Sequence, residues 1–202
     1  WHTVTVRDAM DMTPGMDCEE NEATRADPSS NAIRAFLAEF NHPVNGKVET
    51  LLEVLQSSCR VGTPGDKFEY GSPCTQVLVY LAEAVSGLPW AELFRRNVWS
   101  HVRADGPFQA HLTPDGVALA HGVVSSTLRD MARFGMLYTP SWSNVATRQV
   151  VSEDVLARIR GGVRDKAFFL NGYDGPIFVD RLGDDTILGN ARQWACTWPD
   201  GD

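Results

Sequence analysis

Gly62-Thr-Pro-Gly-Asp-Lys-Phe-Glu-Tyr70-Gly-Ser72-Pro73 is the stretch around which the rest of this chain is organised. The Pro64-Gly65 pair predicts a tight turn, and the residues after it alternate between apolar and polar. An amphipathic segment then runs over Ser72–Ser86 and stops at Gly87, as expected of a helix with a left-handed last residue. A turn, a short extended piece and a helix would present one side chain where the helix begins, and we predict that this side chain is Tyr70.

A tyrosine in such a place can do acid–base chemistry. A phenol has an ordinary pKa of about 10, so it is a poor base at neutral pH unless a nearby cation stabilises the phenolate. The positive end of a helix dipole acts in the same direction. A tyrosine so placed can take a proton from a serine hydroxyl and return it to a leaving group. The structural alternative is a half-buried tyrosine that ends a strand.

Ser72 also has two readings. Serine followed by proline is the pattern of a helix N-cap with proline at the first helical position, so Ser72 would accept a backbone N–H. The same residue would lie beside Tyr70 and contact a substrate. The two roles do not exclude each other.

Amphipathic spacing predicts further helices upstream of this stretch. Thr5 and Asp8 have capping-box spacing before a short helix that ends by Pro14-Gly15. The acidic residues 17–30 lack apolar periodicity and are predicted to be a surface loop. Helices follow over residues 31–40 and 49–57. The first of these places four large apolar side chains on one face: Ile33, Phe36, Leu37 and Phe40.

Downstream, the helix after Gly71 carries an apolar stripe of Leu78, Leu81, Ala82 and Val85. Pro89 begins another helix, and Thr127 and Ser152 are predicted to cap two more. From residue 167 the pattern changes to apolar pairs among Gly and Asp, which predicts strands or extended loops: Phe168, Phe169, Ile177, Phe178, Val179, Ile187 and Trp194. We expect one helix-rich unit over residues 1–202, mainly helical over 1–166.

Composition excludes several classes of protein. The 202 residues are 43% hydrophobic and 22% charged, which is ordinary for a globular domain with a sizeable core. The net charge of −8 gives no basic surface for nucleic acid. No apolar run approaches the roughly 18 residues that span a bilayer. The chain begins with Trp1 rather than Met, so we expect its natural N-terminus to lie elsewhere, and the compartment stays open.

Neither the cysteines nor the histidines predict a metal site or a cofactor. Cys18, Cys59, Cys74 and Cys196 form no C-x-x-C, and disulfides are compatible with their spacing only if the protein is exported. His111 and His121 flank a loop without a carboxylate at ligand spacing. We therefore expect no metal and no cofactor.

Three blocks of the sequence resemble the serine β-lactamase-like hydrolases, the superfamily of class C β-lactamases, penicillin-binding proteins and related esterases and amidases. The first runs from Val4-Thr5-Val6-Arg7-Asp8 to Pro14-Gly15, the second from Pro64-Gly65 through Tyr70-Gly71-Ser72 to Gly87, and the third from Val123 to Gly135. They occur in the family's order and cover most of the chain. The resemblance implies an α+β transpeptidase-like fold, of which this chain holds the mainly helical part and an incomplete core sheet.

The resemblance also implies an acyl-transfer mechanism. In the family a Ser-x-x-Lys serine attacks a carbonyl, a Tyr-x-Asn tyrosine helps to move its proton, and a third motif lies on a core strand. Tyr70 matches the motif's tyrosine and is expected to be catalytic. Ser72 stands where the family has asparagine and is expected to bind substrate.

This sequence departs from the family pattern in two ways. It contains no Ser-x-x-Lys and ends before a strand with the third motif, so we expect an internal portion that is inactive alone and pairs with the remainder of its own domain. Serine in place of asparagine weakens the case for β-lactam hydrolysis, because a hydroxyl offers less to a substrate amide than an asparagine side chain does. The run from Tyr70-Gly-Ser72-Pro-Cys-Thr75 to Gly87 instead resembles the carboxylesterase and aminohexanoate-oligomer hydrolase branch. The expected substrate is a small ester or amide. The alternative is a binding module that has lost its nucleophile.

Overall fold

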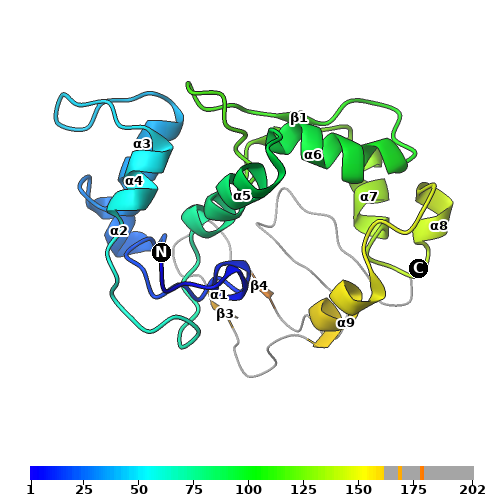
Figure 1. Ribbon diagram of the computed structural model, residues 1–202, viewed down its shortest axis with the longest axis horizontal. Helices are drawn as coiled ribbons and strands as arrows, with labels where there is room; N and C mark the ends of the chain where they lie inside the picture. The colour runs from blue at the N-terminus through cyan, green and yellow to red at the C-terminus, as the bar shows by residue number, and fades with distance from the viewer. Residues whose placement is uncertain (162–167, 170–177, 180–202) are drawn as a thin grey trace. The chain divides into compact units, whose positions relative to one another are not determined.

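The computed structural model describes residues 1–161, 168–169 and 178–179 (Figure 1). Contacts between Cα positions divide the chain into two compact units. The first comprises Trp1–Ala91 and Ala110–Val124, and the second Glu92–Gln109 and the residues from Ser125 on. The expectation of a single unit over residues 1–202 stays a prediction.

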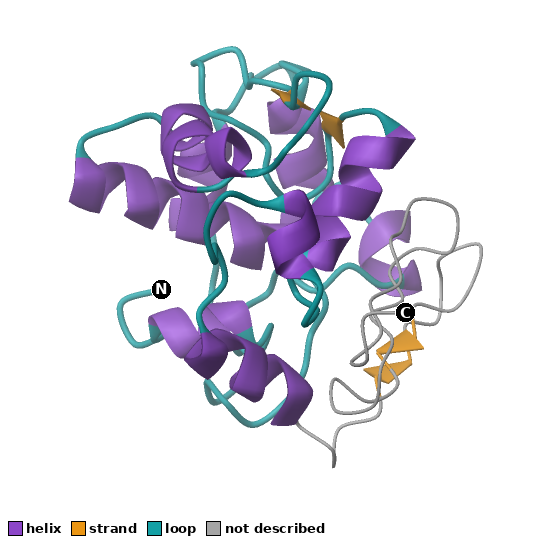
Figure 2. Ribbon diagram, turned by 90° about the vertical axis from the view of Figure 1, so that its right-hand side faces the viewer, coloured by secondary structure: helices purple, strands orange, loops and turns teal. Residues whose placement is uncertain are grey.

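Helices dominate both units (Figure 2). The first unit holds α1 (Val6–Met10), α2 (Glu22–Ala26), α3 (Asn31–Glu39), α4 (Leu51–Ser57) and α5 (Ser72–Ser86). Helix α6 (Trp90–Asn97) leads into the second unit, which continues with η1 (Trp99–His101), α7 (Leu128–Met136), α8 (Trp142–Val145) and α9 (Glu153–Gly161).

The strands are short. Strands β1 (Gln109–Ala110) and β2 (Val124–Ser125) pair with each other. Strands β3 (Phe168–Phe169) and β4 (Phe178–Val179) form an antiparallel pair in which Phe168 lies opposite Val179. The predicted class, mostly helical with antiparallel strands near the C-terminus, is confirmed. Ile177, Ile187 and Trp194, which were also predicted to be extended, lie outside the described residues.

Local capping signals account for several helix boundaries. The Thr5 side chain accepts from the Asp8 backbone amide and the Asp8 carboxylate accepts from that of Thr5, so the predicted capping box is present. Thr127 caps α7 through the Asp130 amide. Helix α5 ends at Gly87, whose φ of 68° lies in the left-handed region that glycine adopts without strain.

The acidic segment contains a helix that the sequence analysis missed. Residues 17–30 were predicted to be a surface loop, but Glu22–Ala26 form α2. Asn21 and Thr24 make a reciprocal capping box around its first turn. The helix buries no residue, so it has no apolar stripe, and hydrophobic periodicity could not reveal it.

Helices α3 and α4 pack through small side chains. The buried face of α3 contains Ala35 and Ala38, which join Leu51, Val54, Leu55 and Leu119 in one cluster. Sequence periodicity had pointed to the opposite face: Phe36 is 55% exposed and Phe40 is 37% exposed. Alanines allow two helices to approach closely. The rings of Phe36 and Phe40 instead pack edge to face on the surface, with their centroids 5.3 Å apart.

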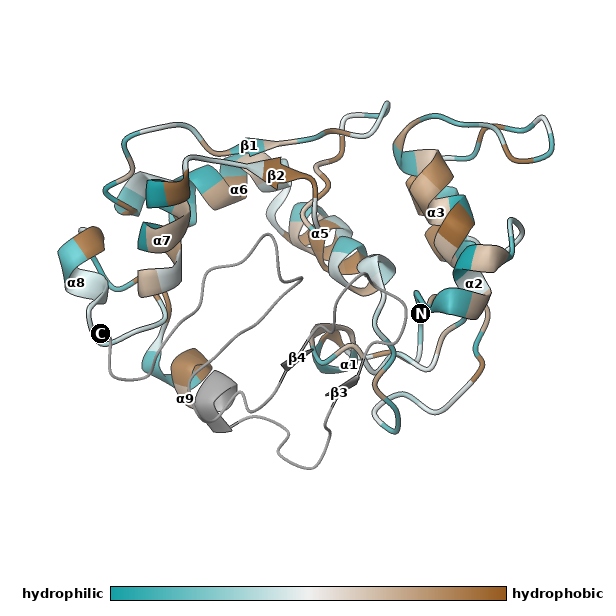
Figure 3. Ribbon diagram, turned by 180° about the vertical axis from the view of Figure 1, so that it is seen from behind, coloured by the Kyte–Doolittle hydropathy of each residue, from teal (hydrophilic) through white to brown (hydrophobic). Residues whose placement is uncertain are grey.

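Helix α5 also turns an unexpected face inward. Its buried residues are Pro73, Cys74, Gln76 and Val79, whereas Leu81 is 42% exposed and Val85 is 88% exposed. The predicted stripe is therefore wrong as a buried face. In Figure 3 hydrophobic and hydrophilic residues are mixed along this helix. The fully buried Gln76 shows why hydropathy misled: a hydrogen-bonded amide takes a core position.

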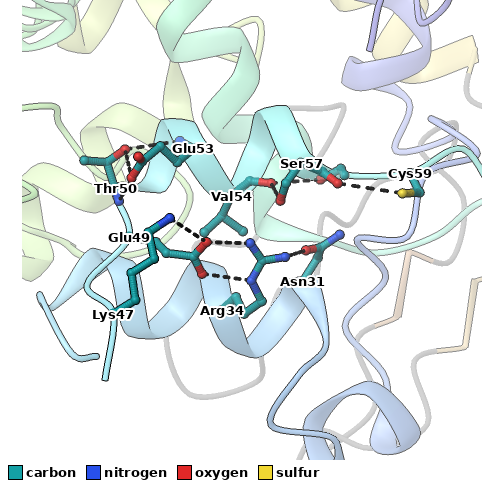
Figure 4. Close-up of polar contacts among 10 residues, drawn as sticks. Asn31, Arg34, Lys47, Glu49, Thr50, Glu53, Val54, Ser57 and Cys59 are labelled. Atoms are coloured by element: carbon teal, nitrogen blue, oxygen red, sulfur yellow. Dashed lines mark hydrogen bonds and ion pairs between the residues drawn. The ribbon is translucent and has the colours of Figure 1, made fainter. Parts of the chain in front are cut away.

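A bidentate ion pair joins Arg34 of α3 to Glu49, which lies two residues before α4 (Figure 4). Arg34 donates from Nε to Glu49 Oε2 at 2.9 Å and from Nη2 to Oε1 at 2.7 Å. Its remaining nitrogen donates to Asn31 Oδ1 at 2.6 Å. The hydrogen bond with Arg34 is the largest of the effects that lower the Glu49 pKa. Both partners are mostly buried, so solvent screens this pair less than a surface ion pair.

The second unit is organised around Asp130, whose side chain is fully buried. Its carboxylate accepts from the backbone amides of Asp105 and Gly106, both at 3.0 Å. It also accepts from Thr127 Oγ1 at 2.8 Å and from Arg133 Nη1 at 2.6 Å. These bonds, led by that of the Asp105 amide, outweigh burial and lower the pKa of Asp130 to about 2.

A separate apolar cluster of Val102, Leu137, Val145 and Ala146 fills the core of this second unit.

Among the described residues, no single helix is long and apolar enough to cross a membrane. One bent pair, α5 and the segment from Trp90 to His101, meets the length and composition criteria only when the two are taken together.

The Arg34–Glu49 pair yields a stability prediction. Arg34→Ala removes both guanidinium donors from the mostly buried Glu49 carboxylate, so we expect the free energy of unfolding to fall by about 2 kcal/mol. Arg7→Ala is the control, because its pair with Asp11 is exposed and such pairs contribute about 0–1 kcal/mol. Urea denaturation measures both. Equal losses in the two variants would contradict the role given to Arg34.

Asp130 yields a pH prediction. Its pKa in the folded chain is about 2, below the ordinary carboxyl value of about 3.9. The stability that it contributes is therefore present above the unfolded-state pKa and is lost as the pH falls from about 5 toward 2. Asp130→Asn should flatten this acid-side slope in urea denaturation, whereas Asp66→Asn, at an exposed carboxylate, should leave it unchanged. An unaltered slope in Asp130→Asn would count against the buried network.

Candidate active site

Tyr70 lies immediately before α5, where the sequence placed it, and its residue is half-buried. Its carbonyl oxygen accepts a hydrogen bond from the Glu20 backbone amide at 2.7 Å. Two residues later, the Ser72 backbone amide donates to Glu20 Oε1 at 2.6 Å. Glu20 therefore holds the chain on both sides of Gly71 and fixes the point from which the Tyr70 side chain departs.

The Ser72 side chain does not cap the helix, which corrects one of the two sequence readings. The N-cap is Gly71, and Ser72 is the first helical residue with Pro73 after it. The Glu20 carboxylate accepts from the first turn instead, as an anion at a helix N-terminus is expected to do. Among the described residues, no hydrogen bond is found for the Ser72 hydroxyl.

The stretch that carries Tyr70 is fixed by main-chain bonds to an upstream segment, residues 12–20. Glu69 donates to the Met12 carbonyl at 2.7 Å, and Gly65 donates to that of Thr13 at 2.8 Å. Met16 and Arg60 form an antiparallel bridge. These bonds place the turn and the extended piece without using the side chains at positions 70 and 72.

Gly71 is required by a close approach of two backbones. Its φ of −164° is extended and imposes no preference for glycine. A Cβ at this position, however, would lie 2.4 Å from the Cys18 carbonyl oxygen. No real Cβ contact is that short, so any side chain at position 71 displaces either residues 16–18 or the start of α5.

Lys67 is the nearest cation in sequence to Tyr70, and it is already paired. Its Nζ lies 3.2 Å from Glu69 Oε1 and 3.3 Å from Glu19 Oε2. Burial alone would lower the Lys67 pKa, but the hydrogen bond and charge of these carboxylates outweigh it and raise the pKa. Two carboxylates therefore share the charge of Lys67.

Other reactive side chains in the described chain are poorly placed for catalysis. Cys18 and Cys74 are fully buried free thiols, and a hydrogen bond between them, together with burial, raises the Cys18 pKa. Burial, Asp115 and Glu83 raise the pKa of Tyr80 to about 12, and burial raises the pKa of Tyr138. Within the described residues no group of three or more His, Cys, Asp or Glu side chains could hold a metal ion.

The sequence analysis missed Glu20, which the structure makes central to this site. Residues 17–30 were treated as a solvated excursion, yet Glu20 bonds on both sides of Gly71. No periodicity marks a carboxylate that acts on a helix 52 residues downstream. No sequence signal indicated this role, because Ser72-Pro73 predicted a side-chain cap that the structure does not contain.

Comparisons with known proteins show the family of this chain. The family model described as Beta-lactamase matches residues 1–194. This chain belongs to the Beta-lactamase family. The predicted resemblance to the serine β-lactamase-like hydrolases is thereby confirmed, and with it the expectation of a hydrolase family.

Two known proteins are similar to this chain. A 6-aminohexanoate-dimer hydrolase of Paenarthrobacter ureafaciens is 31% identical over 131 residues, which are 65% of this chain and 31% of that protein. The solved structure of a putative 6-aminohexanoate-dimer hydrolase from Bacillus anthracis superposes with a TM-score of 0.66 at 19% identity. It covers 81% of this chain and 43% of its own, and it shows the shared fold. The chain thus spans less than half the length of both relatives.

The close approach at Gly71 gives a prediction for this site. Gly71→Ala should lower the free energy of unfolding by about 1–3 kcal/mol, because backbone has to move to admit the methyl group. It should also shift the amide resonances from Tyr70 to Cys74. Gly122→Ala is the matched control, since a Cβ there meets no atom within 4 Å. Urea denaturation and two-dimensional NMR measure the two effects, and a Gly71→Ala variant as stable as the control would refute the steric argument.

Proposed function

We propose that this chain is part of a serine hydrolase that cleaves an ester or amide through an acyl-enzyme, with Tyr70 as the general base and acid. Ser72 contacts the substrate. The 202 residues contain no Ser-x-x-Lys, so the nucleophile in this proposal lies elsewhere in the protein, together with the third family motif. Membership of the Beta-lactamase family supports the reaction class.

The observation that carries the proposal is the position of Tyr70 and Ser72 on either side of Gly71 at the start of α5. Helix N-termini favour negative charge, which stabilises a phenolate and the oxyanion of an acyl transfer. Because Glu20 anchors the backbone here, the Tyr70 phenol has a defined origin. Pre-positioning of this kind is what a proton-transfer group requires.

In this mechanism the Tyr70 phenolate takes the proton of the attacking serine hydroxyl and later delivers it to the leaving amine or alcohol. Tyr80 and Tyr138 are poor candidates for the same role, because burial raises their pKa values and disfavours the phenolate. The Cys18 thiol is a poor nucleophile for the same reason, and the Cys74 thiol is fully buried.

For the substrate we propose a linear amide or ester of a small acid. The relatives are named for a 6-aminohexanoate dimer, in which two amino acids are joined by an amide. The Ser72 hydroxyl supports this class over a β-lactam, because it has shorter reach and fewer hydrogen-bonding groups than the family's asparagine amide.

A non-catalytic binding module is the alternative, and one experiment separates it from the enzyme. The full-length protein is treated with a serine-directed phosphonate and analysed by mass spectrometry. Covalent labelling at a Ser-x-x-Lys serine supports the hydrolase. If the serine is not labelled and the protein does not hydrolyse an activated ester, the result supports the binding module.

Tyr70→Phe tests the base directly. In the full-length protein we expect kcat/KM for an amide or ester substrate to fall by about 100- to 10,000-fold, because general base catalysis contributes that much. Tyr80→Phe is the matched control: its hydroxyl is buried without a hydrogen bond among the described residues, so activity should be retained. A loss below about threefold in Tyr70→Phe, with the fold intact by circular dichroism, would remove Tyr70 from the mechanism.

A further inference from the structure

A buried histidine in the first unit lies between two side chains from different helices. His121 Nε2 lies 3.1 Å from Glu39 Oε1 of α3, and its Nδ1 lies 3.3 Å from Gln76 Oε1 of α5. The side chains of His121 and Glu39 are 8% and 6% exposed, and Gln76 is fully buried. Helices α3 and α5 pack against each other.

The orientation of the Gln76 amide follows from its other bond. Gln76 Nε2 donates to the Ala118 carbonyl at 2.9 Å. The reverse orientation would set two acceptor oxygens against each other, so Oε1 has to face the histidine. Since Oε1 can only accept, His121 Nδ1 carries a proton.

The second ring nitrogen faces a carboxylate. A proton shared between imidazole and a carboxylic acid resides on the imidazole, which is the stronger base by about two pK units in water. His121 Nε2 then also donates, and the ring bears a positive charge beside an ionised Glu39. Buried charges are tolerated in proteins when they are paired and hydrogen-bonded in this way.

We propose that Glu39, His121 and Gln76 form a buried charged lock between α3, α5 and the loop before β2, with His121 protonated on both ring nitrogens in the folded chain. This inference does not depend on the role of Tyr70. If Tyr70 is the base, the lock has a further consequence: it restrains the helix that begins two residues after the phenol, which makes His121 a positioning residue.

Neighbouring ionisable groups have other partners. Along the loop that leads to His121, Asp115 accepts from Thr113 Oγ1 at 2.6 Å, and the ring of His111 packs against Phe40. On the helices, Arg34 pairs with Glu49, and Glu83 accepts from the Trp90 amide. Glu39 is therefore the charge that His121 faces.

The attraction between the two side chains exists only while His121 is protonated and Glu39 is ionised, so removing either charge removes the pair.

Nitrogen-15 NMR of the chain as it exists tests the protonation state. At neutral pH we expect both His121 ring nitrogens to show directly bonded protons, and the exposed His42 serves as the reference ring in the same spectrum. A His121 ring with one bare nitrogen under folded conditions would overturn the proposal, because the pair would then be neutral.

Glu39→Gln tests the lock without changing its shape. We expect the ring to lose one proton at neutral pH and the equilibrium constant of unfolding to rise on the order of 100-fold, since the charged hydrogen-bonded pair no longer forms. His42→Gln is the control and should leave both readouts unchanged. A change in the unfolding constant below about threefold, or a ring that stays doubly protonated in Glu39→Gln, would refute the lock.

Discussion

The hydrogen bonds of Glu20 across Gly71 are the constraint on which the candidate site depends. One residue supplies its backbone amide to the Tyr70 carbonyl and its carboxylate to the Ser72 amide. The first bond continues the main-chain contacts between residues 12–20 and the Tyr70 stretch, and the second begins helix α5. The extended piece and the helix therefore share one anchor. The absence of a side chain at Gly71 is what lets the Cys18 carbonyl come close enough for this arrangement.

Buried, hydrogen-bonded polar side chains take core positions that are usually occupied by large apolar side chains. Gln76 occupies a core position of α5, and Asp130 binds the backbone amides of Asp105 and Gly106 in the loop between η1 and β1. Each is satisfied by backbone groups from distant segments. Such groups are costly when unpaired and directional when paired, so they select one arrangement of the chain. Apolar side chains such as Val85 stay exposed on the other face of the same helices.

The sequence predicted what depends on neighbouring residues and failed where distant segments meet. Thr5 and Thr127 were correctly identified as caps because their partners lie three residues away. The predicted buried faces of α3 and α5 were wrong, because the spacing of apolar residues does not reveal which face of a helix packs against another segment. The contacts of Glu20 and Glu39 could not be predicted for the same reason, because each side chain binds a residue many positions downstream in the sequence. His121 was judged to lack a carboxylate nearby in sequence, yet the fold brings Glu39 to it.

This division between backbone and side chain explains why the chemistry proposed for Tyr70 can be tested cleanly. The anchors of residues 70–72 pass through main-chain groups, so exchanging a phenol for a phenyl ring leaves them in place. The same holds at position 72, where the hydroxyl makes no cap. The path of this segment is thus fixed by main-chain atoms of residues 65–72 and by the Glu20 carboxylate. If Tyr70 and Ser72 act as proposed, their reacting groups are separate from these anchoring bonds, whereas a change at Gly71 or Glu20 alters the bonds themselves.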